Sequence, residues 1–300
     1  MRQTGAVLQP TGGSTDDDLR GRGDYGSAAN VGAREARNPV LMIMNPDVTI
    51  SRLDRDEMAR LANGGRMGLI GGTMVPSDSD GSRVLAALQP QHGLLRGAAR
   101  LAFGPLGLAS RLRIRQGSDR QVAVGRARWV VGALLIASRE EFLELGGFNE
   151  RIFLYAEDRD LSFRYVASGL PVDQADFAQG SHALGGSSDR RPEDFARLRA
   201  WAILGWLQFL SDSQGVAVAR RGWLAYRVFD RIARALVAPG ALIVPGSAFR
   251  PKAAEFRAIA HAITAVCAAG GRVDGRRFCP DSIAIVTGGI PDRSRMGAGG

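Results

Sequence analysis

Apolar and polar residues alternate in blocks along this chain, and the first two thirds of the blocks predict an α/β domain. Three continuous apolar runs have the character of strands buried on both faces, at 39–44, 67–75 and 129–137. Apolar residues at helical spacing predict helices at 28–37, 49–61 and 140–145, and a further strand near the sheet edge is expected at 170–175. Doubly buried strands separated by helices favour a mixed, mainly parallel sheet flanked by helices.

The last third of the chain changes to long amphipathic patterns, which predict a C-terminal helical appendage at 192–209, 222–237 and 251–269. Two interpretations remain open for these helices. They pack on the α/β domain and on one another, or they lie in the plane of a membrane surface. A weakly patterned stretch rich in glycine and arginine, residues 85–121, is predicted to form a lid that approaches the lipid or the acceptor.

These patterns divide the chain into four parts. Residues 1–22 are polar and are expected to be disordered, residues 23–190 form the α/β domain, and residues 191–269 form a helical region next to the membrane. Residues 270–300 are expected to be a mostly disordered tail.

Composition limits the cellular setting. The chain has 300 residues, 45% of them hydrophobic, and no uncharged apolar run approaches 18 residues, so no transmembrane helix is predicted. The N-terminus does not resemble a signal peptide, and the two cysteines are most simply free thiols of a reduced, cytoplasmic protein. The net charge is +9, of which residues 212–277 contribute +7. Basic residues mixed with tryptophan favour the cytosolic face of an anionic membrane over nucleic acid, for which no motif is present.

The first candidate site is a group of acids, Glu157, Asp158 and Asp160, at the start of a helix that Gly169 ends. Two readings remain: the acids only complement the helix dipole, or the large residues just before them hold a carboxylate at a cleft edge as a general base. Arg164 is predicted to form an i,i+4 ion pair with Asp160.

The second candidate site follows the apolar run 39–44. Asn45-Pro46-Asp47 is either a simple turn or the end of a strand whose Asp47 binds a divalent cation. His182 is either a hydrogen-bonded structural residue or a metal ligand. Gly132, inside the run 129–137, leaves room for a ligand or a backbone to come close.

Several of these stretches together resemble the family 2 glycosyltransferases of the rhamnosyltransferase-like branch. GFNE at 147–150, FLYAEDRDL at 153–161 and Arg164 are similar to that family's GGFDE…FFxYxEDxDLxxR signature. NPD at 45–47 resembles its DXD metal motif, and HALGGS at 182–187 resembles its H-x-x-G-x-S element. The resemblance covers about residues 23–210, and Asn149 stands where the family usually has aspartate.

The resemblance implies a GT-A-like fold and an inverting transfer from a nucleotide sugar, most simply dTDP-rhamnose, to a lipid-linked saccharide or polysaccharide acceptor. It implies that Asp158 is the catalytic base and that Glu157 and Asp160 orient the acceptor or nearby basic side chains. The residues it implies for donor binding are Asn30, Asn45, Asp47, Trp129 and Gly132. Asp47, with His182, would hold Mg²⁺ or Mn²⁺.

A second feature also departs from the family pattern. GDYGSAAN at 23–30 resembles a segment that the family precedes with a strand unit for the nucleotide, and only 22 residues precede it here. A misassigned gene start, a fragment and a loss of donor binding are the alternatives. The rival functions are therefore a catalytically inactive binding or scaffolding relative, and a basic protein that binds nucleic acid or membrane through residues 212–277.

Overall fold

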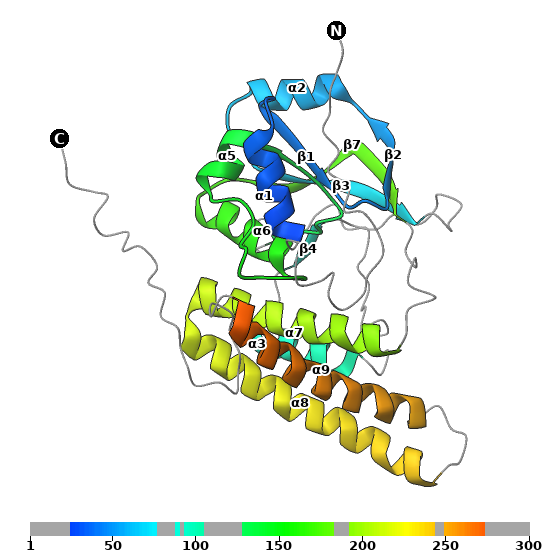
Figure 1. The fold of residues 1–300 in the computed structure, drawn as a ribbon. Helices are drawn as coiled ribbons and strands as arrows, with labels where there is room; N and C mark the ends of the chain where they lie inside the picture. Colours follow the sequence, from blue (N-terminus) through cyan, green and yellow to red (C-terminus); the bar gives the residue numbers. More distant parts are fainter. Residues whose placement is uncertain are drawn as a thin grey trace, which may run out of the picture.

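The computed structural model describes residues 25–76, 88–90, 93–104, 128–182, 192–243 and 249–273. These residues form two layers, an α/β layer built on a five-stranded sheet and a layer of long helices packed beneath it (Figure 1). Within the described ranges, no helix has the length and apolar character needed to cross a membrane. The predictions of disorder for residues 1–22 and for the tail at 270–300 lie outside the described ranges, except that the last helix continues through Val273.

The α/β layer consists, in chain order, of α1 (Tyr25–Glu35), β1 (Val40–Met44), β2 (Val48–Leu53), α2 (Arg55–Asn63), β3 (Leu69–Pro76), β4 (Leu88–Pro90), β5 (Arg128–Val130), β6 (Leu134–Ser138), α5 (Arg139–Glu144), α6 (Glu157–Ala167) and β7 (Val172–His182). The helical layer consists of α3 (Leu94–Phe103), α7 (Pro192–Gln214), α8 (Val216–Ile243) and α9 (Phe249–Val273). The mixed α/β class expected from the sequence is confirmed.

The prediction of a mainly parallel sheet is wrong. The strand order is β1-β6-β3-β7-β2, and only β3 and β7 run parallel; the other three neighbouring pairs are antiparallel. The apolar runs predicted where these strands lie, and β6 is buried on both faces, whereas β1 at the sheet edge is mostly only partly buried. Burial does not fix strand direction. A strand covered by helices on both faces reads as a continuous apolar run whichever way its neighbour runs.

Two elements also differ from their predicted form. Residues 49–61, expected to be one helix, divide into β2 and α2 at Asp54, whose Oδ1 accepts hydrogen bonds from the N–H groups of Asp56 and Glu57. A short strand followed directly by a capped helix can together show an apolar spacing that resembles one longer helix. β7 is longer than expected and lies between β3 and β2 rather than at the sheet edge.

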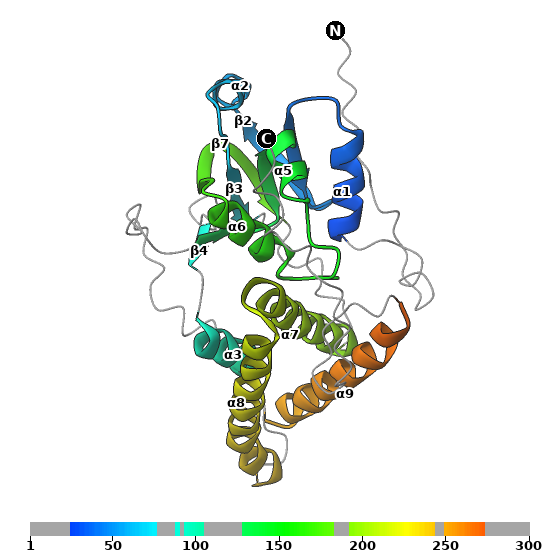
Figure 2. The ribbon, with the colours of Figure 1, turned by 90° about the vertical axis from the view of Figure 1, so that its left-hand side faces the viewer.

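The two faces of the sheet carry separate cores, and β6 shows how they divide. Leu135 and Ala137 face the core under α1, α5 and α6, whereas Leu134 and Ile136 face the opposite core, against which α2 packs. All four side chains are buried, as the alternation of a strand between two covered faces requires. Figure 2 shows α1, α5 and α6 gathered on one side of the sheet.

The helical layer contains part of the segment that was predicted to be a lid. Its described part, α3, is a helix that packs against α7 and α8, with Ala98 and Ala102 buried. A Cβ on Gly97 would lie 3.0 Å from the Trp206 ring, so α3 approaches α7 closely. The lid prediction is therefore wrong for residues 94–103, and the rest of that segment is outside the described residues except β4.

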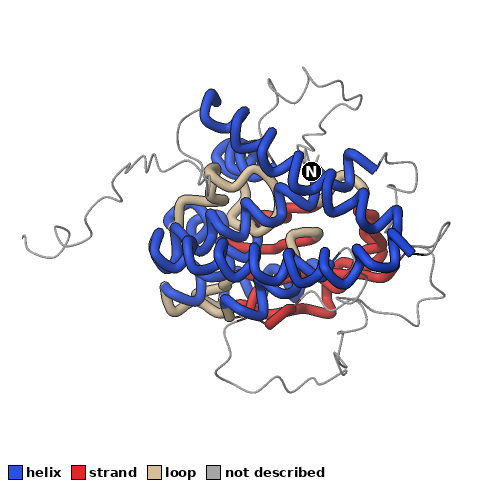
Figure 3. The backbone as a smooth tube through the Cα atoms, turned by 90° about the horizontal axis from the view of Figure 1, so that it is seen from below, coloured by secondary structure: helices blue, strands red, loops and turns tan. Residues whose placement is uncertain are grey.

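The two layers meet through aromatic contacts at α6 and α7. The rings of Phe163 and Phe209 lie 5.8 Å apart, and those of Phe153 and Trp201 lie 4.4 Å apart. Ile152 belongs to the core of the helical layer. Seen from the side of the long helices, the strands lie behind them (Figure 3). The acidic helix start is thus enclosed between the sheet and α7.

Candidate active site

One end of the sheet brings together the turn after β1, the turn between β5 and β6, and the start of α6. The Asn45 N–H donates to the Ala133 carbonyl at 3.0 Å, and the Gly132 N–H donates to Asp158 Oδ2 at 2.8 Å. The Tyr25 hydroxyl donates to the Gly132 carbonyl at 3.2 Å. The predicted strand 129–137 is broken here into β5 and β6, and this break links the NPD turn to the acidic motif.

Asp158 has the environment of a general base. Its carboxylate is partly buried, and burial raises its pKa from 3.8 to about 6, although hydrogen bonds from the N–H groups of Gly132 and Arg159 oppose that rise. A Cβ on residue 132 would lie 3.2 Å from the Asp158 Cβ, so glycine permits this close approach. A carboxylate with a pKa near 6 is ionised at neutral pH and basic enough to take up a proton during a reaction.

The backbone just before α6 is strained. Tyr155 and Ala156 have φ values of 64° and 74°, in the left-handed region that non-glycine residues rarely adopt. Such residues cost about 1–3 kcal/mol each and persist where surrounding structure holds them. Here α7 is that structure, because a Cβ on Gly205 would lie 2.2 Å from the Tyr155 carbonyl oxygen. This left-handed turn directs the first turn of α6 toward the Gly132 turn, where the Gly132 N–H contacts Asp158.

Glu157 lies beside Asp158 in the first turn, where the helix dipole stabilises negative charge. Burial, followed by the charges of Glu157 and Asp158, raises the pKa of Tyr25, so its phenol stays protonated and donates to Gly132. Sequence analysis did not predict a role for Tyr25. Its place in the GDYGSAAN segment was the only available signal.

Asp160 lies inside the fold. Its side chain is only 4% exposed, and its Oδ2 accepts from Arg164 Nε at 2.9 Å. Arg164 also donates through Nη1 to the Leu145 carbonyl at 2.6 Å. Burial raises the pKa of Asp160 despite the opposing effect of Arg164. The predicted i,i+4 pair is confirmed, and it anchors α6 to the end of α5.

Asn30 also makes contacts within the protein. Its Oδ1 accepts from the Phe148 N–H at 2.7 Å, and its Nδ2 donates to the Phe148 carbonyl at 2.9 Å and to Glu150 Oε1 at 3.0 Å. These bonds attach α1 to the GFNE turn. The structure therefore places Asn30 at a joint that supports the site, and a direct contact with the donor stays a prediction.

The two candidate metal ligands are Asp47, in the turn just before β2, and His182, the last residue of β7. Asp47 is exposed and directly precedes Val48, whose Cα pairs with that of His182 on β7. Among the residues that the structure describes, no group of three or more His, Cys, Asp or Glu side chains could hold a metal ion. One or two protein ligands fit Mg²⁺ or Mn²⁺ only as a cation shared with phosphate oxygens and water, not as a structural metal.

Trp129 and Val130 belong to β5, which packs against α6. Trp129 is partly buried, and the Val130 N–H donates to Ser162 Oγ at 3.2 Å. The Ser162 hydroxyl in turn donates to the Asp158 carbonyl at 2.7 Å. Ser162 thus ties β5 to the acidic turn of α6, a role that sequence reasoning missed because i,i+4 spacing from Asp158 was its only signal.

Positive charge lies beside the acid on the side of the helical layer. The Arg159 guanidinium lies over the Phe209 ring, 4.9 Å from its centroid. Burial and the charge of Arg100 on α3 lower the pKa of Arg159 to about 10, although Asp158 raises it. Arg159 therefore remains charged at neutral pH. Sequence analysis did not predict that Arg100 and Arg159 interact, because it assigned residues 85–121, which include α3, to a lid.

The asparagine that departs from the family pattern has a partner on α7. Asn149 Nδ2 donates to Asp212 Oδ2 at 2.8 Å, and Arg151 Nη1 donates to Asp212 Oδ1 at 2.8 Å. Gln208 also donates to both oxygens of Asp212. An aspartate at 149 would place two carboxylates in contact, so the amide suits this neighbour.

We expect Asn149→Asp to lower the free energy of unfolding by about 1–3 kcal/mol, because like charges would meet in a partly buried site. The double variant Asn149→Asp/Asp212→Asn restores an amide–carboxylate pair and should recover at least half of that loss. Urea denaturation of both single variants and the double variant measures this coupling. Strictly additive effects would contradict the contact between the two residues.

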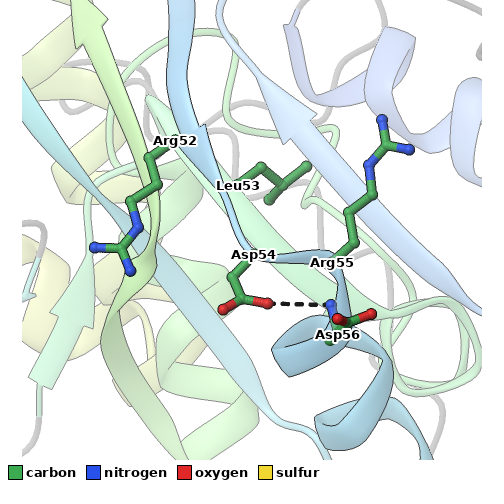
Figure 4. A pocket seen from close by; sticks show the side chains of 5 residues that line it. All are labelled: Arg52, Leu53, Asp54, Arg55 and Asp56. Atoms are coloured by element: carbon green, nitrogen blue, oxygen red, sulfur yellow. Dashed lines mark hydrogen bonds between the residues drawn. The ribbon is translucent and has the colours of Figure 1, made fainter.

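The structure also has a shallow depression elsewhere, at the junction of β2 and α2, which Arg52, Leu53, Asp54, Arg55 and Asp56 line (Figure 4). Asp54 is occupied there as the cap of α2, and the two guanidinium groups point away from each other. The charged side chains that line the depression therefore do not converge on a single ligand. The Asp158 environment is the stronger candidate site.

The chain resembles known proteins over part of its length. No protein-family model matches it. It is 30% identical over 159 residues to the N-acetylglucosaminyl-diphospho-decaprenol L-rhamnosyltransferases of two strains of Mycobacterium tuberculosis, CDC 1551 / Oshkosh and H37Rv. The match covers 51% of this chain and 49% of each relative, so the chain spans about half the length of the curated relatives it matches. This similarity supports a glycosyltransferase relationship.

Proposed function

We propose that this chain is an inverting glycosyltransferase that moves a sugar from a nucleotide-sugar donor to a lipid-linked acceptor. The observation that carries the proposal is the Asp158 carboxylate, held by the Gly132 N–H beside the NPD turn with its pKa raised to about 6. The names of the two mycobacterial relatives support rhamnose as the sugar and a diphosphate-linked saccharide on a polyprenol as the acceptor. A polysaccharide is the other acceptor that the family resemblance implies.

The chemistry assigned to Asp158 is proton removal. As the acceptor oxygen forms a bond to the sugar C1, the bond from C1 to the diphosphate oxygen breaks, and the nucleoside diphosphate leaves with the bonding electrons. The proton of the acceptor hydroxyl passes to the Asp158 carboxylate. The Gly132 N–H fixes Oδ2, and the strained turn at Tyr155 and Ala156 holds the carboxylate in place.

The remaining residues position the substrates. Asn45, Trp129 and Gly132 would contact the donor, and Glu157 would orient the acceptor. Asp160 acts through Arg164 on the position of α6. Arg159 and Arg100 supply positive charge beside the acid, which suits an acceptor that carries a diphosphate.

Asp47, with His182 at the adjacent register position, would hold a divalent cation, Mg²⁺ or Mn²⁺. Bound there, the cation would offset the negative charge of the leaving diphosphate. The donor's phosphates and water would supply the remaining ligands of such a cation.

The donor site is tested by calorimetry of dTDP and UDP binding with and without Mg²⁺ or Mn²⁺. We expect metal-dependent binding that Asp47→Asn weakens at least tenfold, because the cation loses its carboxylate. Asp56→Asn is the matched control, since Asp56 is also exposed but lies on α2, and it should bind as the unaltered chain does. Equal weakening by both variants would contradict a specific role for Asp47.

The transfer itself is tested with labelled dTDP-rhamnose and N-acetylglucosaminyl-diphospho-polyprenol as acceptor. The expected result is a labelled lipid-linked disaccharide. A folded chain that neither binds nucleotide nor transfers sugar would overturn the proposal. The chain would then be better described as an inactive transferase-like binding or scaffolding protein.

A further inference from the structure

One side of α8 exposes a row of large apolar side chains. They recur every four residues, so they follow one another along the same side of the helix. The exposed fractions are 64% for Leu224, 46% for Val228, 45% for Ile232 and 60% for Leu236. The opposite side is buried against α3, α7 and α9, through Ala219, Tyr226, Ala233 and Val237. The helix is therefore already anchored, and the exposed row is not needed for that packing.

Arginines flank this row. The exposed arginines of the helix are Arg220, Arg221, Arg227 and Arg231. The one acid in the sequence of α8, Asp230, is partly buried and pairs with Arg234 at 2.7 Å. The exposed side thus combines apolar residues with positive charge and carries no exposed carboxylate of its own. We call the four apolar residues and the four exposed arginines the α8 face.

The α8 face lies in the part of the molecule away from the sheet. In both Figure 1 and Figure 2, α8 lies below α7, on the side of the helical layer opposite the α/β layer. A helix side that faces water normally carries polar residues, and continuous apolar rows on a surface mark interaction sites. The position allows a broad partner to approach without covering the Asp158 end of the sheet.

We propose that the α8 face binds an anionic phospholipid surface. The apolar row enters the boundary between headgroups and acyl chains, and the arginines pair with lipid phosphates. Charge complementarity favours this partner, since the face offers arginines and no acid and an anionic bilayer offers phosphate throughout its surface. The helix would lie in the plane of the surface, because its opposite side is packed against α3, α7 and α9. This inference does not depend on the proposed transferase activity.

The test is flotation of the full chain with vesicles of phosphatidylcholine alone and with vesicles containing 30% phosphatidylglycerol, without sugar, nucleotide or metal. We expect binding to the anionic vesicles that 0.5 M NaCl weakens. Val228→Asp should lower the affinity at least tenfold. Its matched control is Val31→Asp, since Val31 is 47% exposed on α1 and far from the α8 face in the sequence. The control should bind as the unaltered chain does.

A second pair of variants tests the charge. Arg227→Gln/Arg231→Gln should lower affinity for the anionic vesicles on the order of tenfold, as two lipid-facing arginines imply. Arg37→Gln/Arg66→Gln removes the same charge from exposed positions in the α/β layer and should have little effect beyond a small long-range contribution. All four altered positions are exposed, and circular dichroism melting checks that each variant is folded.

Three results would overturn the proposal. They are no binding of the unaltered chain to anionic vesicles, equal loss in the test and control variants, and a dimer in light scattering that Val228→Asp dissociates. The last result would assign the face to a second copy of the chain. If sugar transfer fails while vesicle binding shows the expected pattern, only the transferase proposal falls.

Discussion

Replacing Asp158 by asparagine is expected to lower kcat/KM for sugar transfer by about 10²–10⁴-fold, the usual contribution of a general base. The asparagine Oδ1 can still accept from the Gly132 N–H, so the local structure should survive while the proton acceptor is lost. Asp173→Asn is the matched control, because Asp173 is an exposed aspartate on β7, and it should leave the rate unchanged. Activity of Asp158→Asn within threefold of the unaltered chain would remove Asp158 from the mechanism.

The same residue sets the expected pH dependence. Transfer requires ionised Asp158, so kcat/KM should rise with pH and level off above about 6, the raised pKa of this carboxyl. Asp158→Asn should lose this acidic limb from whatever activity remains. A limb near pH 4 in the unaltered chain would indicate that the base is a carboxyl with an ordinary pKa.

Stability gives an independent check with a defined sign. Because the pKa of Asp158 is raised from 3.8 to about 6 by folding, the folded chain holds this proton more tightly than the unfolded chain. Its contribution to stability is therefore fully present below about pH 4 and is lost as pH rises through about 6. Above that pH, Asp158→Asn should be more stable than the unaltered chain by about 1–3 kcal/mol in urea denaturation. The difference should shrink toward pH 4.

Gly205→Ala is expected to lower the free energy of unfolding by about 1–3 kcal/mol, although alanine inside a helix normally stabilises it by up to about 1 kcal/mol relative to glycine. The reversed sign follows from the contact with the strained turn. The added Cβ would lie 2.2 Å from the Tyr155 carbonyl oxygen, a backbone atom that cannot turn aside as a side chain does. Either α7 or the turn at Tyr155–Ala156 must move.

The functional effect of Gly205→Ala should exceed its effect on folding. Displacing the turn moves the Asp158 carboxylate, and misplacing a catalytic group by about 1 Å can cost about 10²-fold in rate. Activity should therefore fall at temperatures where the variant is still folded by circular dichroism. Gly93→Ala is the control, because no atom of the described residues lies within 4 Å of its Cβ position and its φ is ordinary. An increase in the stability of Gly205→Ala would contradict the close packing of α7 on this turn.

Several features of this protein were decided by local sequence. The apolar runs predicted β1, β3 and β6, since a strand covered on both faces needs a continuous apolar pattern. The acids followed by helical spacing predicted α6, and Gly169 at φ 73° ends it as expected. The pair between Asp160 and Arg164 was predictable because residues four apart on a helix are neighbours.

Other features were decided only by tertiary structure. The sheet is mainly antiparallel because strand direction depends on how distant strands pair, which apolar content does not record. Packing against α7 and α8 makes α3 a buried helix in a segment whose own pattern is weak. The role of Asn149 depends on its hydrogen bond to Asp212, a residue 63 positions away.

The candidate site shows the same division. The sequence indicated which carboxylates matter, because their types and spacing resemble a known signature. It did not give the pKa of Asp158, which depends on burial between layers and on the Gly132 N–H, 26 residues earlier in the chain. Nor did it predict the left-handed turn at Tyr155 and Ala156, which α7 holds through Gly205. Local pattern determined which chemical groups are present. Long-range packing decided the pKa of Asp158 and the orientation of its carboxylate.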